Sequence, residues 1–321
     1  MTAKIFLSFF IAIIISFIGI PLIIKLDRFL SLGKVIRDLG PQKHKKKAGT
    51  PTMGGIVIIL AIVSSIFVTG IHDPAAIFFI ATVLLFGFIG FLDDWMCYRY
   101  KNSIGLKARY KLMFQIIFSL VIGYGIWILQ NHGLTRFSLN IQNVYLYLAW
   151  FAFIVIASSN AVNLTDGLDG LAASIYATCS FVFIMIAFSQ GLESTAVISA
   201  AACGACIGFI WYNFYPAKIF MGDVGSLALG ALLGLLALYT RCELLLPFIG
   251  IIFVAETLSV IIQVIYFKMT KGKRVFKMTP LHHHFELSGV HEALITVRFT
   301  IINILVAASV FALYYWMVFK R

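Results

Sequence analysis

Five of the thirteen acidic side chains in this sequence lie at the ends of long apolar segments, where they could carry out chemistry together. They are Asp93, Asp94, Asp166, Asp169 and Asp223. A carboxylate costs about 3 kcal/mol at the centre of a bilayer and much less at its interface. Five carboxylates at one interface therefore predict a site for a cation and an anionic substrate, and isolated structural charges fit the pattern less well.

The pair Asp93-Asp94 ends an apolar segment and precedes a basic stretch. Adjacent carboxylates within one helical turn repel each other, so they persist where a cation or basic neighbours neutralise them. The carboxyl end of a helix is also an unfavourable place for acids. The pair therefore favours a functional role. The basic residues that follow are Arg99, Lys101, Lys107, Arg109 and Lys111.

Two further acidic motifs contain glycines beside the acids. Asn163, Asp166 and Asp169 are three residues apart and would share a face of a helix, but the glycines among them favour a turn. In the other motif Asp223 stands between glycines and precedes Ser226, which can cap the next helix. Capping alone does not explain a second acid-rich turn.

A basic loop ends in Lys47-Ala-Gly-Thr-Pro-Thr-Met-Gly-Gly55. Its lysines suit lipid headgroups. The prolines and glycines predict a fixed turn, and Thr52 with the free N–H groups of a following helix would suit an anion. A packing role for this segment is equally compatible with the sequence.

A histidine-rich motif, Pro280-Leu-His-His-His-Phe-Glu286, lies in the last basic loop. Three consecutive histidines cannot all bind one zinc ion from a regular element, so imidazoles beside a phosphate-rich substrate are favoured. In the preceding apolar segment, Glu256 and Gln263 lie seven residues apart on one helical face and should point into the bundle. Glu256 could serve the site or only bridge helices.

Composition identifies an all-α polytopic membrane protein. Hydrophobic residues make up 61% of the 321 residues and charged residues 12%, whereas soluble chains carry about 25% charged residues. Ten apolar segments are long enough to be considered as spans of a core about 30 Å thick, and the fifth and eighth are the shortest. We predict spans at Ala3–Ile24, Gly55–Ile71, Ala75–Leu92, Leu112–Gln130, Tyr145–Asn160, Leu171–Phe188, Ala196–Tyr212, Ser226–Thr240, Leu244–Phe267 and Val297–Phe319.

Basic residues predict the orientation. Most of the 25 Lys and Arg fall in the loops after the odd-numbered segments, while the alternate loops hold only Arg136 and Arg241. By the positive-inside rule the odd loops and the acidic motifs are cytoplasmic, and both termini lie outside. The acidic motifs and the net charge of +12 thus share one face.

Taken together, these segments resemble the phospho-N-acetylmuramoyl-pentapeptide-transferases, a family of polyprenyl-phosphate hexosamine-1-phosphate transferases. The superfamily shares the Asp93-Asp94 pair, the Asn163–Gly170 motif and Asp223, whereas Lys47–Gly55 and Pro280–Glu286 are specific to this family. The resemblance covers the whole chain and implies one integral-membrane transferase domain, residues 1–321, with about ten helices and a cytoplasm-facing cleft. It also implies a broken ninth helix beside a hydrophobic groove for lipid, and a homodimer.

The resemblance implies roles for individual residues. Asp223 would bind Mg²⁺, and Asp93 and Asp94 would lie beside a lipid phosphate; with His282 they form the expected catalytic set. Leu168 and Phe220 would pack on uracil. The full expected substrate-binding set is Lys47, Thr52, Lys111, Asn163, Asp166, Leu168, Asp169, Asn213, Phe220, Gln263 and His283.

One position departs from the family pattern. The family usually has Asp-Asp-x-x-Lys, and this chain has Cys97 in place of the lysine. A neutral thiol does not neutralise a phosphate. Either Arg99 or Lys101 substitutes for the missing cation, or that contact is dispensable.

The implied reaction transfers phospho-MurNAc-pentapeptide from UDP-MurNAc-pentapeptide to undecaprenyl phosphate, giving lipid I and UMP in the bacterial inner membrane. Since the reacting groups are anionic, charge neutralisation by Mg²⁺ and basic groups would dominate catalysis. Direct attack is preferred to an aspartyl-phosphate intermediate, which the sequence leaves open. The alternatives are a transferase that uses UDP-GlcNAc and a cation transporter; nothing indicates a nucleic-acid partner.

Overall fold

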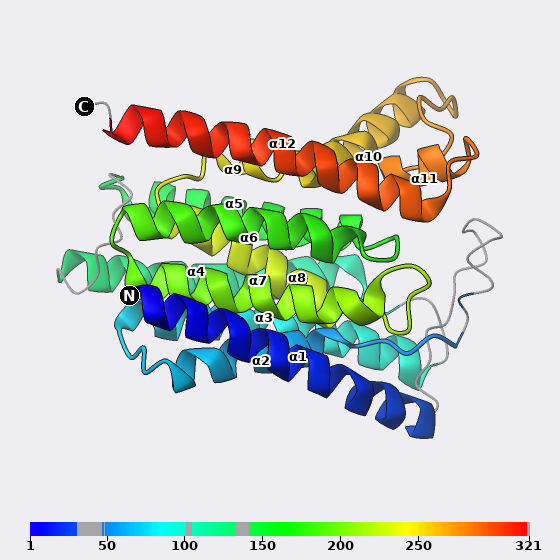
Figure 1. Cartoon of the computed structure of the whole chain (residues 1–321). Coiled ribbons are helices and arrows are strands. Elements are labelled where there is room, and N and C mark those ends of the chain that lie inside the picture. Colours follow the sequence, from blue (N-terminus) through cyan, green and yellow to red (C-terminus); the bar gives the residue numbers. More distant parts are fainter. Residues whose placement is uncertain (31–46, 48, 101–104, 133–140, 320–321) are drawn as a thin grey trace.

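The structure is a computed structural model that describes residues 1–30, 47, 49–100, 105–132 and 141–319. All regular structure in these residues is helical, as predicted from the composition (Figure 1). The helices are α1 (Thr2–Leu30), α2 (Gly55–Val68), α3 (Pro74–Arg99), α4 (Ala108–Asn131), α5 (Val144–Thr165), α6 (Leu171–Ser189), α7 (Glu193–Asn213), α8 (Gly222–Tyr239), α9 (Leu246–Ile249), α10 (Ile251–Met269), α11 (Leu281–Glu286) and α12 (Glu292–Phe319).

Within the described residues, nine helices are long and apolar enough to cross a membrane. The fifth and eighth predicted segments, expected to be short, form helices of 22 and 18 residues. The eighth is therefore the shortest of the nine, and α2 is shorter still, with 14 residues, or about 21 Å at 1.5 Å per residue. Its first two N–H groups, of Gly54 and Gly55, are bonded to the carbonyls of Phe220 and Met221, which fixes where it begins.

Helix α8 is the centre of the bundle. Of the 18 residues of α8, 94% are buried, whereas only 22% are buried in an 18-residue stretch of α10. Small residues allow its neighbours to approach closely: a Cβ added to Gly230 would lie 2.6 Å from the Cα of Ser159 on α5, and one added to Gly90 of α3 would lie 2.1 Å from the carbonyl oxygen of Asp223. The helix that carries Asp223 is therefore held from several sides.

The ninth predicted segment is broken, as the resemblance implied. Gly250 separates the short α9, which has Pro247 in its first turn, from α10, which leaves the bundle at an angle (Figure 1). Backbone groups freed by such a break need partners inside a membrane. Asn303 of α12 supplies them, since its amide donates to the carbonyl of Ile249 (3.2 Å) and accepts from the N–H of Ile252 (3.5 Å).

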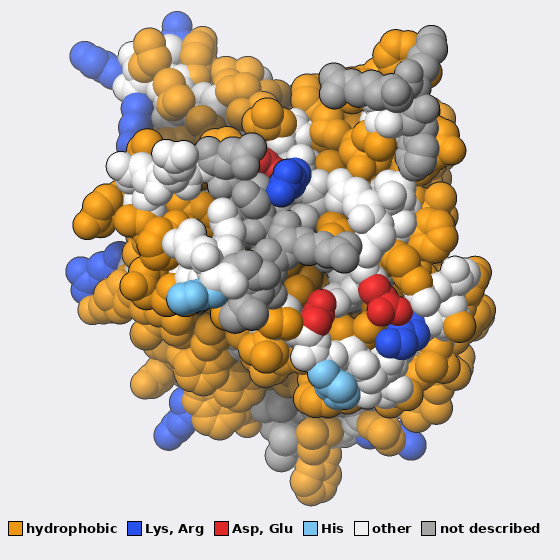
Figure 2. All heavy atoms as spheres, turned by 90° about the vertical axis from the view of Figure 1, so that its left-hand side faces the viewer, with side chains coloured by type: hydrophobic (Ala, Val, Ile, Leu, Met, Phe, Trp, Pro, Cys, Tyr) orange, Lys and Arg blue, Asp and Glu red, His pale blue; other side chains and the backbone are white. Residues whose placement is uncertain are grey.

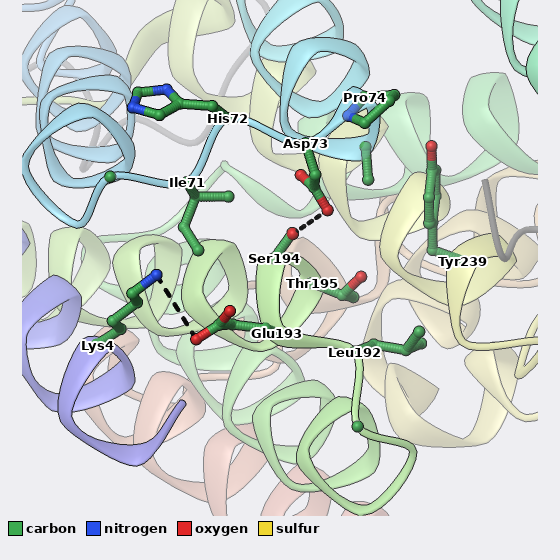
Figure 3. Close-up of a pocket in the computed structure, with 13 residues that line it drawn as sticks. Lys4, Ile71, His72, Asp73, Pro74, Leu192, Glu193, Ser194, Thr195 and Tyr239 are labelled. Atoms are coloured by element: carbon green, nitrogen blue, oxygen red, sulfur yellow. Dashed lines mark hydrogen bonds and ion pairs between the residues drawn. The ribbon is translucent and has the colours of Figure 1, made fainter. Parts of the chain in front are cut away.

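The start of α3 and the end of α8 lie at the end of the bundle away from Asp93, Asp94 and Asp223. Figure 2 shows this end, where charged side chains are few among apolar ones. A cavity of about 470 Å³ opens here between the starts of α3 and α7. Figure 3 shows Lys4 reaching Glu193 (3.8 Å) and Ser194 bonded to Asp73, whose other oxygen caps α3. These polar groups satisfy one another, so the cavity is built as a structural contact between helices.

Candidate active site

The acidic side chains of α3 and α8 converge, as the sequence predicted. Asp93 and Asp94 lie in the last turns of α3, which continues to Arg99, and Asp223 lies in the first turn of α8. One oxygen of each carboxylate lies within 4.8 Å of the others, and the three are buried or half-buried. We call these residues the acidic cluster.

Lys111 of α4 neutralises part of the acidic cluster. Its ammonium lies 3.0 Å from Asp93 Oδ1 and 2.5 Å from Asp223 Oδ2. Asn163, at the end of α5, donates from Nδ2 to Asp223 Oδ1 and to the hydroxyl of Ser226, both at 2.9 Å. Helices α3, α4, α5 and α8 thus each contribute a side chain to one centre. Among these is the basic residue that the resemblance placed after the acidic pair.

Local backbone geometry fixes the orientation of each carboxylate. The N–H of Leu106 donates to Asp93 Oδ1 (3.0 Å), and the N–H of Val224 donates to Asp94 Oδ2 (3.1 Å). Gly105 lies so close that an added Cβ would sit 2.6 Å from Asp93 Oδ2. Gly222 has a φ of +76°, which favours glycine, and an added Cβ would lie 2.5 Å from Asp94 Oδ2. The glycines beside the acids therefore allow close approach of backbone and carboxylate.

Ser226 does not cap α8, contrary to the sequence prediction. The helix already begins at Gly222, and the Ser226 hydroxyl donates to the Gly222 carbonyl (3.1 Å) within the first turn. It also accepts from Asn163. Ser226 therefore supports the side chain that holds Asp223.

The acidic cluster fits a hard divalent cation. Mg²⁺ binds carboxylate oxygens and is usually held by one or two protein carboxylates together with substrate oxygens. The Lys111 ammonium, which lies against two of the three carboxylates, shows that this place already accepts positive charge. Asp223 and one or both of Asp93 and Asp94 are the residues that could hold the ion.

A second polar centre ties the turn after α5 to distant parts of the chain. Residues 166–170 form the predicted turn. Asp169 Oδ1 pairs with the Lys47 ammonium (2.6 Å), and its N–H donates to Glu292 of α12 (2.8 Å). Lys47 also pairs with Glu292. Although burial lowers the pKa of Lys47, its hydrogen bonds and charge attraction to Asp169 and Glu292 raise it above the usual value, so the residue is a cation here.

Several expected substrate-binding side chains are occupied in holding the loops. Asn213 accepts from the N–H of Gly170 (3.0 Å) and donates to the carbonyl of Ile219 (2.8 Å). Gln263 accepts from the N–H groups of Val275 and Phe276 (3.0 and 2.9 Å). Both are buried, as are Leu168 and Asp169. The side-chain amides of Asn213 and Gln263 position the loops around the site.

Of the two roles that the sequence left open for the segment before α2, the structure supports packing. The N–H groups of Gly54 and Gly55, expected to be free for an anion, are bonded at 2.9 Å to the carbonyls of Phe220 and Met221. The glycines serve close packing instead, because a Cβ on Gly55 would lie 2.2 Å from the N of Gly225. Thr52 is buried, and its N–H lies 3.5 Å from Asp27 of α1.

This pairing places Lys47 beside the loop before α8. The ammonium of Lys47 lies 5.9 Å from the centre of the Phe220 ring, which is half-buried. Lys47, Phe220 and Asp169 therefore border one region, with Asp166 at the end of α5 close to it in sequence. The expected nucleotide-binding residues Lys47, Asp166 and Phe220 keep accessible surface there.

The histidines lie on α11, apart from the acidic cluster in sequence. His282 has no exposed surface and lies against Glu256 of α10 and Gly167. The catalytic role expected for His282 stays a prediction. His283 is half-buried and lies 2.8 Å from Glu286.

Two acidic residues of these centres were missed by the sequence reasoning, namely Glu292 and Asp27. Glu292 opens an apolar helix, and Asp27 ends one, so each looks like an ordinary interfacial charge. For the missing family lysine, Cys97 Sγ lies 4.0 Å from Asp93 Oδ2 and Arg99 is exposed. Lys101 lies outside the described residues, as do Lys43, Lys45 and Lys46, the lysines of the basic loop before Lys47.

Comparisons with known proteins match both parts of this site. The family model for glycosyl transferase family 4 matches residues 76–241, which include the acidic cluster. The phospho-N-acetylmuramoyl-pentapeptide-transferase signature 1 matches residues 47–59, which include Lys47 and the paired segment before α2.

Relatives named phospho-N-acetylmuramoyl-pentapeptide-transferase align with almost the whole chain. One from Halalkalibacterium halodurans is 44% identical over 320 residues, covering 97% of this chain and 96% of the relative. One from Carboxydothermus hydrogenoformans is 42% identical over 310 residues, covering 93% and 94%. The chain belongs to this family.

A relative with lower sequence identity also aligns with almost the whole chain. The relative from Rickettsia prowazekii is 40% identical over 326 residues, covering 93% of this chain and 89% of the relative. Family membership confirms the resemblance seen in the sequence, and it favours neither the UDP-GlcNAc transferase nor the transporter alternative.

Proposed function

We propose that the chain transfers phospho-MurNAc-pentapeptide from UDP-MurNAc-pentapeptide to undecaprenyl phosphate, forming lipid I and releasing UMP. An oxygen of the lipid phosphate attacks the β-phosphorus of the nucleotide sugar. The new P–O bond joins the lipid to the sugar phosphate, and the bond to UMP breaks. The observation that carries the proposal is the acidic cluster with Lys111, in a member of this transferase family.

The acidic cluster and Lys111 are proposed to act on the diphosphate. A bound Mg²⁺, held by Asp223 with Asp93 or Asp94, would neutralise developing charge on phosphate oxygens. Lys111 contributes a fixed positive charge at the same place. Asn163 keeps the Asp223 carboxylate in orientation through its 2.9 Å hydrogen bond.

Direct attack by the lipid phosphate is preferred to an aspartyl-phosphate intermediate. Asp93 Oδ1 accepts from Lys111 and from the N–H of Leu106, and Oδ2 lies against Gly105. A carboxylate enclosed in this way is a poor nucleophile. We therefore assign Asp93 and Asp94 to orienting the lipid phosphate.

The nucleotide is proposed to bind beside Phe220, Lys47 and Asp166. The Phe220 ring offers a stacking surface for uracil, and Lys47 offers a cation near it. In this proposal the space between the nucleotide and α11 is bordered by Asn163, Lys111 and His283. Asn213, Gln263, Asp169, Leu168 and Thr52 act by shaping the walls.

The transferase is proposed to form a single domain in the bacterial inner membrane, with its active site cytoplasmic and both termini outside. In the sequence, basic residues gather in the loops at the active-site end, while Figure 2 shows few charged side chains among the described residues at the other end. This asymmetry supports the orientation by the positive-inside rule. Exposed apolar residues of α10, including Leu258 and Ile262, offer a surface for the polyprenyl chain, and a homodimer fits the family.

The decisive experiment measures UMP release from UDP-MurNAc-pentapeptide and undecaprenyl phosphate, with Mg²⁺ and with EDTA. We expect release only with Mg²⁺, and we expect Asp223→Asn to lower kcat by at least about a hundredfold while the protein remains folded in detergent. UMP release by Asp223→Asn at the normal rate under saturating Mg²⁺ would remove Asp223 from the metal site. Ion flux in proteoliposomes without UMP release would instead indicate a transporter.

A further inference from the structure

Helix α10 carries one fully buried acid on an otherwise largely lipid-exposed helix. Glu256 has 0% exposure, whereas Leu258, Ile261 and Ile262 on the same helix are about half exposed. A carboxyl group within the membrane region is costly unless it is paired and hydrogen-bonded. Glu256 therefore requires a partner whose interaction offsets the free energy of burying its carboxyl group.

That partner is the first histidine of α11. The N–H of His282 lies 3.2 and 3.3 Å from the two carboxylate oxygens of Glu256, and His282 Nδ1 lies 3.2 Å from Oε2. One acid thus accepts from the backbone N–H of His282 and lies against its ring, whose two nitrogens make no hydrogen bond to the described residues. Since α11 is only six residues long, this contact fixes where the helix sits on α10.

The opposite edge of the same imidazole supports the turn after α5. A Cβ added to Gly167 would lie 2.3 Å from His282 Nε2, so the turn rests directly on the ring. Asp166 precedes this glycine and Asp169 follows it by two residues. His282 is a spacer between the buried acid and the turn, with its ring 4.2 Å from that of His283.

We infer that Glu256 is a positioning residue for nucleotide binding, acting through His282 on the turn at residues 166–169. This inference rests on the nucleotide position proposed above. It assigns His282 to the same positioning role and explains why both side chains are fully buried. The lipid phosphate and the metal meet the acidic cluster on α3 and α8, so they are less affected by this contact.

The test compares Glu256→Ala and Glu256→Gln with Ser259→Ala. Ser259 is a matched control because it is buried on the same face of α10 and its hydroxyl donates only within its own helix, to the carbonyl of Glu256. UMP affinity of the purified protein is measured by calorimetry without turnover. KM values are then measured for the nucleotide sugar and for undecaprenyl phosphate, together with the unfolding temperature.

We expect Glu256→Ala to weaken UMP about tenfold, the scale of one lost charge-assisted hydrogen bond. The KM of the nucleotide sugar should rise in parallel, while that of the lipid changes by less than about twofold. Glu256→Gln should recover much of the loss, because its amide oxygen still accepts from the His282 N–H. Ser259→Ala should match the wild type.

Gly167→Ala tests the other edge of the ring without touching the acid, and it serves if Glu256→Ala cannot be purified. We expect the same nucleotide-selective loss, because its Cβ displaces the turn from His282. Wild-type affinity for UMP in a folded Glu256→Ala or Gly167→Ala protein overturns the inference. Equal rises in both KM values with a lowered unfolding temperature also overturn it, because they indicate a structural role only. Failure of the wild type itself to bind UMP refutes the proposed function, which is a distinguishable result.

Discussion

Replacing Lys111 with methionine tests how the acidic cluster balances its charge. The ammonium lies 3.0 Å from Asp93 and 2.5 Å from Asp223. At an effective dielectric of about 20, each unit-charge contact at such distances is worth roughly 5.5 to 6.6 kcal/mol before desolvation is subtracted. The Lys111 and Asp223 side chains keep 18% and 26% exposure, so solvent reduces the net value. We expect about 3 kcal/mol of lost transition-state stabilisation in Lys111→Met, or roughly a hundredfold lower kcat.

The same change should strengthen metal binding. Without the ammonium of Lys111, the acidic cluster has more unneutralised negative charge. The Mg²⁺ concentration for half-maximal activity should therefore fall in Lys111→Met even though kcat falls. This opposite movement distinguishes charge balance within the site from simple damage to the fold.

The assay is UMP release over a Mg²⁺ titration, with thermal unfolding in detergent as the check on folding. Arg109→Met is the matched control, because Arg109 lies in the first turn of the same helix, is exposed and contacts the neighbouring Tyr110. It should remain near wild type. Normal kcat in Lys111→Met, or an equal loss in Arg109→Met, would refute the reasoning, since the cation would then act only as general surface charge.

Three further outcomes follow from the geometry. Phe220→Ala should weaken UMP by roughly 1 to 3 kcal/mol, the scale of base stacking on an aromatic ring; unchanged affinity in calorimetry would leave the ring as packing. Cys97→Lys should be tolerated or should lower the KM for an anionic substrate, because the thiol lies 4.0 Å from Asp93 and an added ammonium meets negative charge; a large loss of activity would contradict this. Gly55→Ala should greatly reduce folded protein in detergent, because its Cβ would lie 2.2 Å from the N of Gly225; a normal unfolding temperature would argue against that close contact.

Sequence patterns predicted the helices and the meeting of the acids because both depend on local regularity. Apolar length defines membrane segments, and acids at the ends of alternate segments must lie on one face. The proximity of Asp93 and Asp223 could therefore be predicted from the sequence alone. The turn around Gly167 was likewise visible from its glycines.

What the sequence could not show was which polar groups are already used by the fold. Asn213 and Gln263, expected from the resemblance to bind substrate, both accept from loop N–H groups. The N–H groups of Gly54 and Gly55 looked free and are bonded to another loop. Most of these partners belong to segments distant in the chain; Lys47 and Glu292, for example, are 245 residues apart. Local spacing carries no information about such pairs.

The link from Glu292 to Lys47 and Asp169 has a consequence for biosynthesis. Glu292 opens α12, so the ribosome adds it after nearly all other membrane segments are made. Until then the Asp169 N–H has no carboxylate to receive it, and Lys47 lacks one of its two counterions. We expect nascent chains that stop before α12 to insert in the membrane but to remain inactive. Supplying α12 as a separate polypeptide should restore activity, because the contacts of Glu292 with Lys47 and Asp169 do not require a covalent link between α12 and the rest of the chain.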